Sequence, residues 1–181
     1  TGGEWNMTGR MAHGGKTIYG ARVGILLLDR QFPRVPGDIG NALTWPFPVL
    51  YKVVRGADHE AVILDKAKNV LDIFVAAAAE LVAEGVDGIT TSCGFLSTIQ
   101  EGLRAHCPVP VAASSLMQVP FVERLLPPGK RAGIITESAK NLTEEHLAAA
   151  GAPLDTPVVG IEHGNEFTRV FNQNEMEMDM V

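Results

Sequence analysis

The chain has 181 residues, of which 46% are hydrophobic and 20% are charged, and its formal net charge is -6. This length can bury the core of one large domain or of two small ones. The acidic balance without a basic cluster argues against nucleic-acid binding, and no apolar run approaches the ~20 residues that cross a bilayer. Two cysteines provide neither a disulfide framework nor a metal quartet. We therefore expect a cytoplasmic protein with free thiols and no metal.

Strands and helices are expected to alternate after a loose leader over residues 1–19, which lack the apolar core of a signal peptide. This alternation predicts an α/β fold with parallel sheets. The expected segments are, in chain order, a strand over Ala21–Leu28, a proline- and glycine-rich loop over Gln31–Pro48, a strand over Leu50–Val54, a helix over Asp65–Glu84, a strand over Asp87–Thr91, a helix over Leu96–His106, a strand over Val109–Ala113, a helix over Val119–Leu126, a strand over Arg131–Thr136, a helix over Ser138–Ala150 and a strand over Val158–Glu162.

A short internal repeat predicts two similar halves. The segment RVGIL around Gly24 is matched by RAGII around Gly133, and each opens an expected strand. We expect a first α/β domain over residues 20–117 and the start of a second over residues 118–181. The offset that separates Cys93 from Gly24, counted from Gly133, falls beyond Val181. The second domain is therefore expected to be incomplete, with its equivalent of the Cys93 loop outside this chain.

Cys93 lies in GITTSCGFLS, between an expected strand and an expected helix. Ligands of open parallel sheets bind beyond the carboxyl ends of the strands. The free N–H groups and the positive dipole end of a following helix favour anions and lower the pKa of a thiol. The sequence therefore favours an activated thiol in a carboxylate-binding site. The alternative is a small, buried and inert thiol, which is common for free cysteine.

Hydroxyl groups at several strand ends extend this candidate site. Thr91 and Ser92 precede the cysteine, while Ser114 and Thr136 follow two further expected strands. Gly94 allows a close approach of substrate to backbone. Together these residues predict a polar cleft that binds a small carboxylate.

Other candidates lie outside these strand ends. Asp29 closes the first strand and could orient a site, and Arg30 beside it could grip a carboxylate. Asn41 is either a turn residue or a donor to substrate. Cys107 precedes a strand, so we expect it at the opposite end of the sheet in a structural role. His146 is expected to be solvated on a charged helix face.

A family resemblance is carried by LLLDRQFPRVPGDIGNALTWPFPVLYKVVRGA and by GITTSCGFLS. From about Gly20 onward the chain resembles the aspartate/glutamate/hydantoin racemase superfamily, to which arylmalonate decarboxylase also belongs. The resemblance implies two similar Rossmann-like, three-layer domains, no cofactor, and a substrate held between the domains. It also implies one cysteine from each domain on opposite sides of the substrate's α-carbon, and a homo-oligomer.

The resemblance also assigns roles to residues. It implies that Cys93 is the catalytic cysteine of the first domain, and that its carboxylate-binding surroundings include Thr91, Ser92, Gly94 and Phe95. Asp29 and Asn41 lie where relatives orient the base or contact the substrate. Glutamate racemases, however, have Asp-Ser where this chain has Asp29 followed by arginine.

The expected function is a cofactor-independent amino-acid racemase of the aspartate/glutamate type. One thiolate removes the α-proton and a second thiol returns it from the opposite face, because inversion requires acid–base groups on both sides of the carbon. Two alternatives remain open at this point. One is a one-cysteine, malonate-type decarboxylase, and the other is a carboxylate-binding module without turnover.

Overall fold

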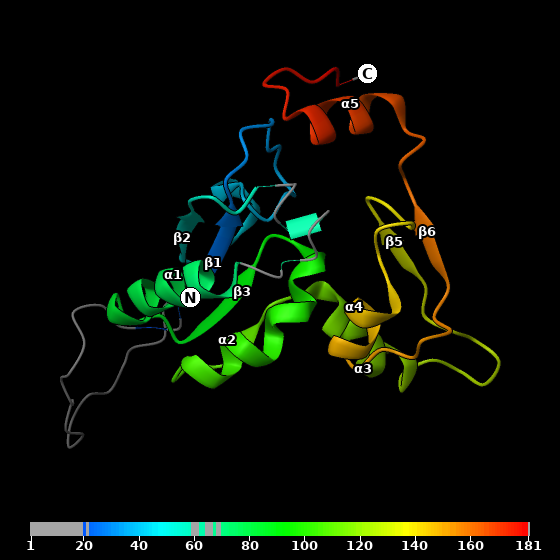
Figure 1. The fold of residues 1–181 in the computed structure, drawn as a ribbon, viewed down its shortest axis with the longest axis horizontal. Helices are drawn as coiled ribbons and strands as arrows, with labels where there is room; N and C mark the ends of the chain where they lie inside the picture. The colour runs from blue at the N-terminus through cyan, green and yellow to red at the C-terminus, as the bar shows by residue number, and fades with distance from the viewer. Residues whose placement is uncertain (1–19, 21, 59–61, 64–66, 68–69, 181) are drawn as a thin grey trace, which may run out of the picture.

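The computed structural model describes residues 20, 22–58, 62–63, 67 and 70–180. The expected leader over residues 1–19 lies outside this range. Two separate parallel sheets organise the described residues (Figure 1). None of the described helices is both long and apolar enough to cross a membrane.

The first sheet has four parallel strands in the order β2-β1-β3-β4. Its central strand is almost entirely apolar and buried along most of its length, as is typical of a parallel strand covered on both faces. The strands are β1 (Val23–Leu28), β2 (Val49–Val54), β3 (Gly88–Thr91) and β4 (Val111–Ala112), and a short 3-10 helix, η1 (Ala42–Thr44), lies between the first two.

Helix α1 (Leu71–Ala83) packs on β1 and β2 through buried side chains that include Phe74 and Leu81. Its expected start at Asp65 falls among residues 64–66, outside the described range. The helix ends as expected at Gly85, whose φ of 86° is in the left-handed region that favours glycine. The 3-10 helix η3 (Gly94–Ile99) continues directly into α2 (Gln100–His106), so the expected helix here is present and starts slightly earlier.

The second sheet has two parallel strands and is flanked by short helices. Its elements are η4 (Ser115–Gln118), α3 (Val119–Glu123), β5 (Ile134–Thr136), α4 (Glu144–Ala149), β6 (Val158–Gly160) and α5 (Asn165–Gln173). Helix α4 starts at Glu144 and not at Ser138, because Thr143 forms a capping box with His146. Helix α5 was not among the expected elements.

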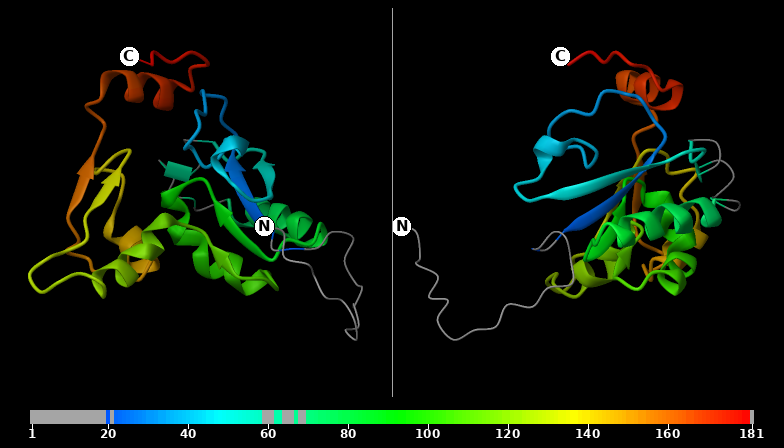
Figure 2. Two further views of the ribbon diagram at one scale, coloured as in Figure 1. Left: turned by 180° about the vertical axis from the view of Figure 1, so that it is seen from behind. Right: turned by 90° about the vertical axis from the view of Figure 1, so that its left-hand side faces the viewer.

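The two sheets stand apart and are bridged at both ends (Figures 1 and 2). Helices α3 and α4 lie at one end, where α4 contacts η3. Helix α5 crosses the other end, where the ring of Phe171 lies 5.5 Å from the ring of Phe32. The expected α/β fold with parallel sheets is confirmed. The division into domains at residues 117 and 118 falls between the two sheets and stays a prediction.

Candidate functional site

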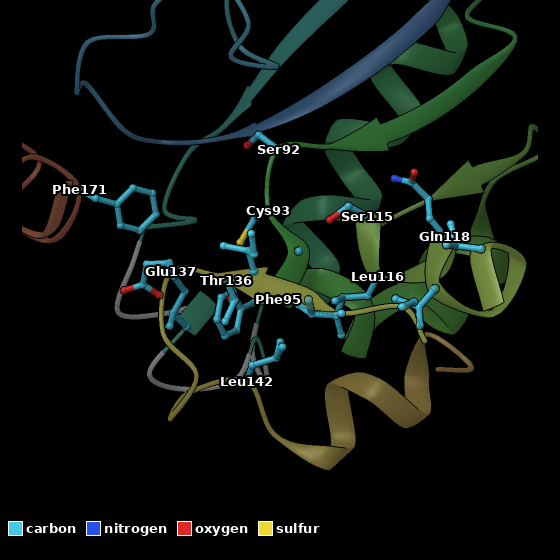
Figure 3. A pocket seen from close by; sticks show the side chains of 18 residues that line it. Ser92, Cys93, Phe95, Ser115, Leu116, Gln118, Thr136, Glu137, Leu142 and Phe171 are labelled. Carbon is cyan, nitrogen blue, oxygen red and sulfur yellow. The ribbon is translucent and has the colours of Figure 1, made fainter. Parts of the chain in front are cut away.

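Two adjoining cavities open at the carboxyl ends of β1, β3 and β5. The larger one, of about 400 Å³, is lined from both sheets by residues that include Cys93, Ser115 and Glu137. The smaller one, of about 90 Å³, lies against the loop that follows β1. Both are lined by Cys93 and Phe171, and Figure 3 shows the sulfur of Cys93 directed into the larger cavity. The cysteine therefore lies where the two cavities meet.

Cys93 is half-buried and caps the N-terminus of η3. Burial raises the pKa of its thiol to about 11, and the negative charge of Glu137 acts in the same direction. The backbone N–H groups of Phe95 and Leu96 lower the pKa, as does the positive charge of Arg30, but these effects are outweighed by burial. The expectation of a lowered thiol pKa is therefore wrong. The thiol is therefore protonated at neutral pH.

Two of the expected substrate-binding hydroxyls support the cysteine loop from behind. Thr91 Oγ1 donates to the carbonyl of Ala113 at 2.7 Å and accepts from the N–H of Cys93 at 3.2 Å. Ser114 Oγ donates to the carbonyl of Gly94 at 2.5 Å. Both hydroxyls are buried, and neither residue lines either cavity. Their contacts fix the shape of the loop.

Four other expected residues line the larger cavity, namely Ser92, Gly94, Phe95 and Thr136. Ser92 also lines the smaller cavity, and its Oγ accepts a hydrogen bond from the N–H of Leu28 at 3.2 Å. Phe95 is buried and forms part of the cavity floor. Thr136 ends β5 and thus brings the second sheet to the site. The structure brings these four residues together with Cys93.

His146 is fully buried, which contradicts the expectation that it is solvated. Its Nδ1 accepts a hydrogen bond from the N–H of Thr143 at 3.2 Å. Its ring meets that of Phe95 edge to face, with 5.2 Å between the centroids. The charged residues around His146 favoured a solvated position, but α4 packs on η3 and places the His146 side chain in this contact. His146 therefore packs behind the cysteine loop.

Asp29 and Asn41 line neither cavity. Oδ1 of Asp29 pairs with Nη1 of Arg55 at 3.0 Å. The side chain of Asn41 donates to the carbonyl of Arg34 at 2.6 Å and accepts from the N–H of Leu43 at 2.8 Å. Asn41 thus acts as a turn and capping residue, and a substrate role for either residue stays a prediction.

The structure adds cavity residues that the expected set leaves out. Ser115 and Glu137 each follow an expected residue by one position and line the larger cavity. Arg30, which the sequence already offered as a carboxylate contact, lines the smaller cavity. Strand-end position alone cannot decide which of two neighbours faces a cavity. Phe171 comes from α5, whose apolar residues Phe167, Val170 and Phe171 have a helical spacing that could have predicted this element.

The fold resembles that of arylmalonate decarboxylase. A structure of arylmalonate decarboxylase, of a cysteine-substituted variant associated with a sulfate ion, superposes with a TM-score of 0.50. The match covers 77% of this chain and 62% of that chain at 15% sequence identity. At this identity the likeness shows the fold alone.

Curated relatives share more of the sequence, although no protein-family model matches. Dimethylsulfoniopropionate lyases 3 and 6 of Emiliania huxleyi (strain CCMP1516) are each 31% identical over 166 residues, which is 88% of this chain and 43% of each relative. A dimethylsulfoniopropionate lyase of Durusdinium sp. clade D is 27% identical over 135 residues, or 74% of this chain and 45% of that protein. The chain thus spans less than half the length of these relatives.

Proposed function

We propose that this protein is a cofactor-independent lyase that acts on a small carboxylate, with Cys93 transferring one proton at the carbon next to the carboxylate. The observation that carries the proposal is the position of the Cys93 thiol at the junction of the two cavities. A ligand that extends from one cavity into the other lies beside the sulfur of Cys93, because both cavities are lined by this residue. The backbone N–H groups of Phe95 and Leu96 lower the pKa of this thiol and so favour a thiolate that forms during turnover.

The named activity of the sequence relatives suggests dimethylsulfoniopropionate as the substrate. The Cys93 thiolate takes the proton from the carbon next to the carboxylate. The electron pair of that C–H bond forms the new C=C bond, and the bond from the β-carbon to sulfur breaks with its electrons going to sulfur. The products are dimethyl sulfide, acrylate and the protonated thiol. This reaction needs a single base on one face.

The raised pKa of the thiol is compatible with this role once the substrate is bound. A sulfonium cation beside the cysteine favours the thiolate, because an opposite charge within about 4–6 Å stabilises the ionised form. The substrate would therefore assist in forming the base that attacks it. A neutral ligand would leave burial dominant and the thiol protonated.

A malonate-type decarboxylase is the second candidate, and the protonated thiol favours it. Loss of carbon dioxide breaks a C–C bond and leaves the electron pair on the α-carbon. The Cys93 thiol then gives its proton to that carbon and is reprotonated from solvent. The amino-acid racemase is a third candidate and needs a second thiol on the opposite face of the substrate; Cys107 does not provide it, because this residue precedes β4 and lines neither cavity.

The test measures the reaction of four substrates with wild-type protein, with Cys93→Ala and with the matched control Cys107→Ala. Gas chromatography follows the release of dimethyl sulfide from dimethylsulfoniopropionate. A carbon dioxide assay follows the decarboxylation of phenylmalonate. NMR follows the α-deuteration of aspartate and glutamate in heavy water. We expect dimethyl sulfide from wild type and Cys107→Ala, and a rate about 10²- to 10⁴-fold lower for Cys93→Ala.

Each other outcome points to one alternative. Carbon dioxide release alone would identify the decarboxylase, and deuteration alone would restore the racemase. No reaction with any substrate would leave a carboxylate-binding module. Equal rates for Cys93→Ala and wild type would remove the cysteine from the mechanism.

A further inference from the structure

Arg30 belongs to the part of the site that follows the first strand, β1. It is half-buried directly after β1, and it lines the smaller cavity together with Ser92 and Cys93. Its Cζ lies 5.9 Å from the ring centroid of Phe32 and 5.2 Å from that of Phe171. Contact with two aromatic rings restricts the motion of the guanidinium group. A ligand that binds this group therefore causes a smaller further loss of side-chain conformational entropy.

Two nitrogen atoms of this guanidinium are buried and have no acceptor among the described residues. Nε and Nη2 of Arg30 are shielded from solvent, and neither has a hydrogen-bond partner in the described part of the chain. Donors left unsatisfied on a buried charged group are costly, and such groups commonly mark a place for a ligand or an ordered water. Arg34, which lines the same cavity, differs because its Nη1 pairs with Asp38 at 2.8 Å.

We propose that Arg30 is the carboxylate-binding residue of the Cys93 site, with the smaller cavity as the carboxylate subsite; this inference rests on the proposed function. Nε and Nη2 lie on one edge of the guanidinium. This edge can donate two parallel hydrogen bonds to the two oxygens of a carboxylate, which is the strongest common geometry for this pair. The smaller cavity, of about 90 Å³, suits a carboxylate better than it suits a bulky substituent.

This subsite fixes the direction in which a substrate lies. Because both cavities are lined by Cys93 and Phe171, a carboxylate held by Arg30 places its neighbouring carbon beside the thiol. The substituent on the next carbon then extends into the larger cavity, towards Glu137. Figure 3 shows the Glu137 carboxylate and the Phe171 ring on the same side of Cys93. A carboxylate and an aromatic face both attract a cation. The expected substrate class is therefore a short acid with a cationic substituent.

The experiment measures binding of propanoate, which has no leaving group, to the full chain by isothermal titration calorimetry. The variants are Arg30→Met, Arg30→Lys and the control Arg104→Met, whose arginine pairs with Glu101 on α2 and lines neither cavity. We expect Arg30→Met to raise the Kd for propanoate at least about 10-fold, as loss of a bidentate charged pair predicts. Arg30→Lys should give an intermediate Kd, and Arg104→Met should match wild type.

A second probe separates loss of the carboxylate contact from general damage. Ethyldimethylsulfonium lacks a carboxylate, so Arg30→Met should not raise its Kd; loss of the positive charge of Arg30 leaves this Kd unchanged or lowers it. Circular dichroism checks that each variant is folded, and if Arg30→Met is not folded the Arg30→Lys result decides. Equal Kd values for propanoate in wild type and in the Arg30 variant would overturn the inference, as would no binding of propanoate to wild type.

The two proposals fail in different ways. If Arg30 controls propanoate binding but wild type releases neither dimethyl sulfide nor carbon dioxide, the carboxylate subsite is supported and the proposed function is wrong. If wild type releases dimethyl sulfide and Arg30→Met changes neither KM nor inhibition by propanoate, the function is supported and the role of Arg30 is wrong.

Discussion

The main-chain N–H of Gln31 donates a 2.8 Å hydrogen bond to Oδ1 of Asn174. This bond joins the residue after Arg30 to the left-handed residue that ends α5. Next to it, the rings of Phe32 and Phe171 lie 5.5 Å apart. The cavity wall that α5 contributes is therefore held against the first sheet by a polar and an aromatic contact.

The Asn174 bond can be tested separately from its backbone shape. Asn174→Gly keeps a residue that tolerates the φ of 55° but removes the amide acceptor. Since one such bond contributes about 0.5–1.5 kcal/mol, we expect amide exchange in α5 to become roughly 2- to 10-fold faster, measured by hydrogen-exchange mass spectrometry. The exposed Asn172→Ala is the control. Unchanged exchange in Asn174→Gly would show that the aromatic contact alone holds the helix.

The Cys93 thiol should titrate only at high pH. Burial raises its pKa to about 11, above the value of about 8.5 for an unfolded thiol. The neutral thiol therefore contributes stability that is complete below about pH 8.5 and is lost as the pH rises through about 11. Thiolate absorbance in a Cys107→Ala background measures the midpoint, and Cys93→Ser is the blank. A midpoint below about pH 8 would mean that the backbone donors prevail.

Glu137 and Arg30 should move this titration in opposite directions. Behind burial, which is the main cause, Glu137 raises the pKa of Cys93 and Arg30 lowers it. Glu137→Gln should therefore lower the midpoint and Arg30→Met should raise it, as read from the pH dependence of alkylation at Cys93 by mass spectrometry. The exposed Glu144→Gln serves as the control. Shifts of the same sign in both variants would contradict this electrostatic picture.

Ser114 and Ser115 are adjacent but should have different effects on stability. Ser114→Ala removes the donor to the Gly94 carbonyl and should lower the free energy of unfolding by about 1–2 kcal/mol in urea titrations. Ser115 is exposed and lines the larger cavity, so Ser115→Ala should stay within about 0.5 kcal/mol of wild type. A reversed order would mean that the loop is not supported through Ser114.

His146 should contribute to stability in spite of its polar ring. His146→Ala removes its part of the capping box and its edge-to-face contact with Phe95, and each is worth about 1 kcal/mol. We expect a loss of about 2 kcal/mol in the free energy of unfolding. The exposed His106→Ala should change it by less than about 0.5 kcal/mol. Equal effects of the two substitutions would contradict the buried placement.

The elements that the sequence predicted well are those with a strong local signal. The apolar run that forms β1 and the strand before Cys93 were expected with nearly the observed bounds. The end of α1 at Gly85 was also expected, because glycine readily adopts the left-handed backbone conformation that ends a helix. The position of Cys93 between a strand and a helix follows from these two elements. Local periodicity is therefore enough to predict the order of these strands and helices along the chain. It is also enough to place Cys93 between a strand and a helix.

The features that were missed depend on contacts between distant segments. His146 is buried because α4 packs on η3, and the pKa of Cys93 is set by burial, which strand-end placement does not reveal. Arg30 meets Phe171 only through the return of α5. The choice between Ser114 and Ser115 depends on how the chain turns after β4. None of these contacts has a signature in a short window of sequence.

The cavities draw their walls from the loop after β1, the cysteine loop, the end of β5 and α5. No single segment forms the site, so a ligand that fills it binds the folded chain and has no matching site in the unfolded one. Occupancy is then linked to folding: a ligand at about 100 times its Kd would add about 2.7 kcal/mol to the free energy of unfolding. The midpoint temperature of thermal unfolding would rise for both sheets together. A screen for compounds that raise this temperature could therefore find the substrate before any product is known.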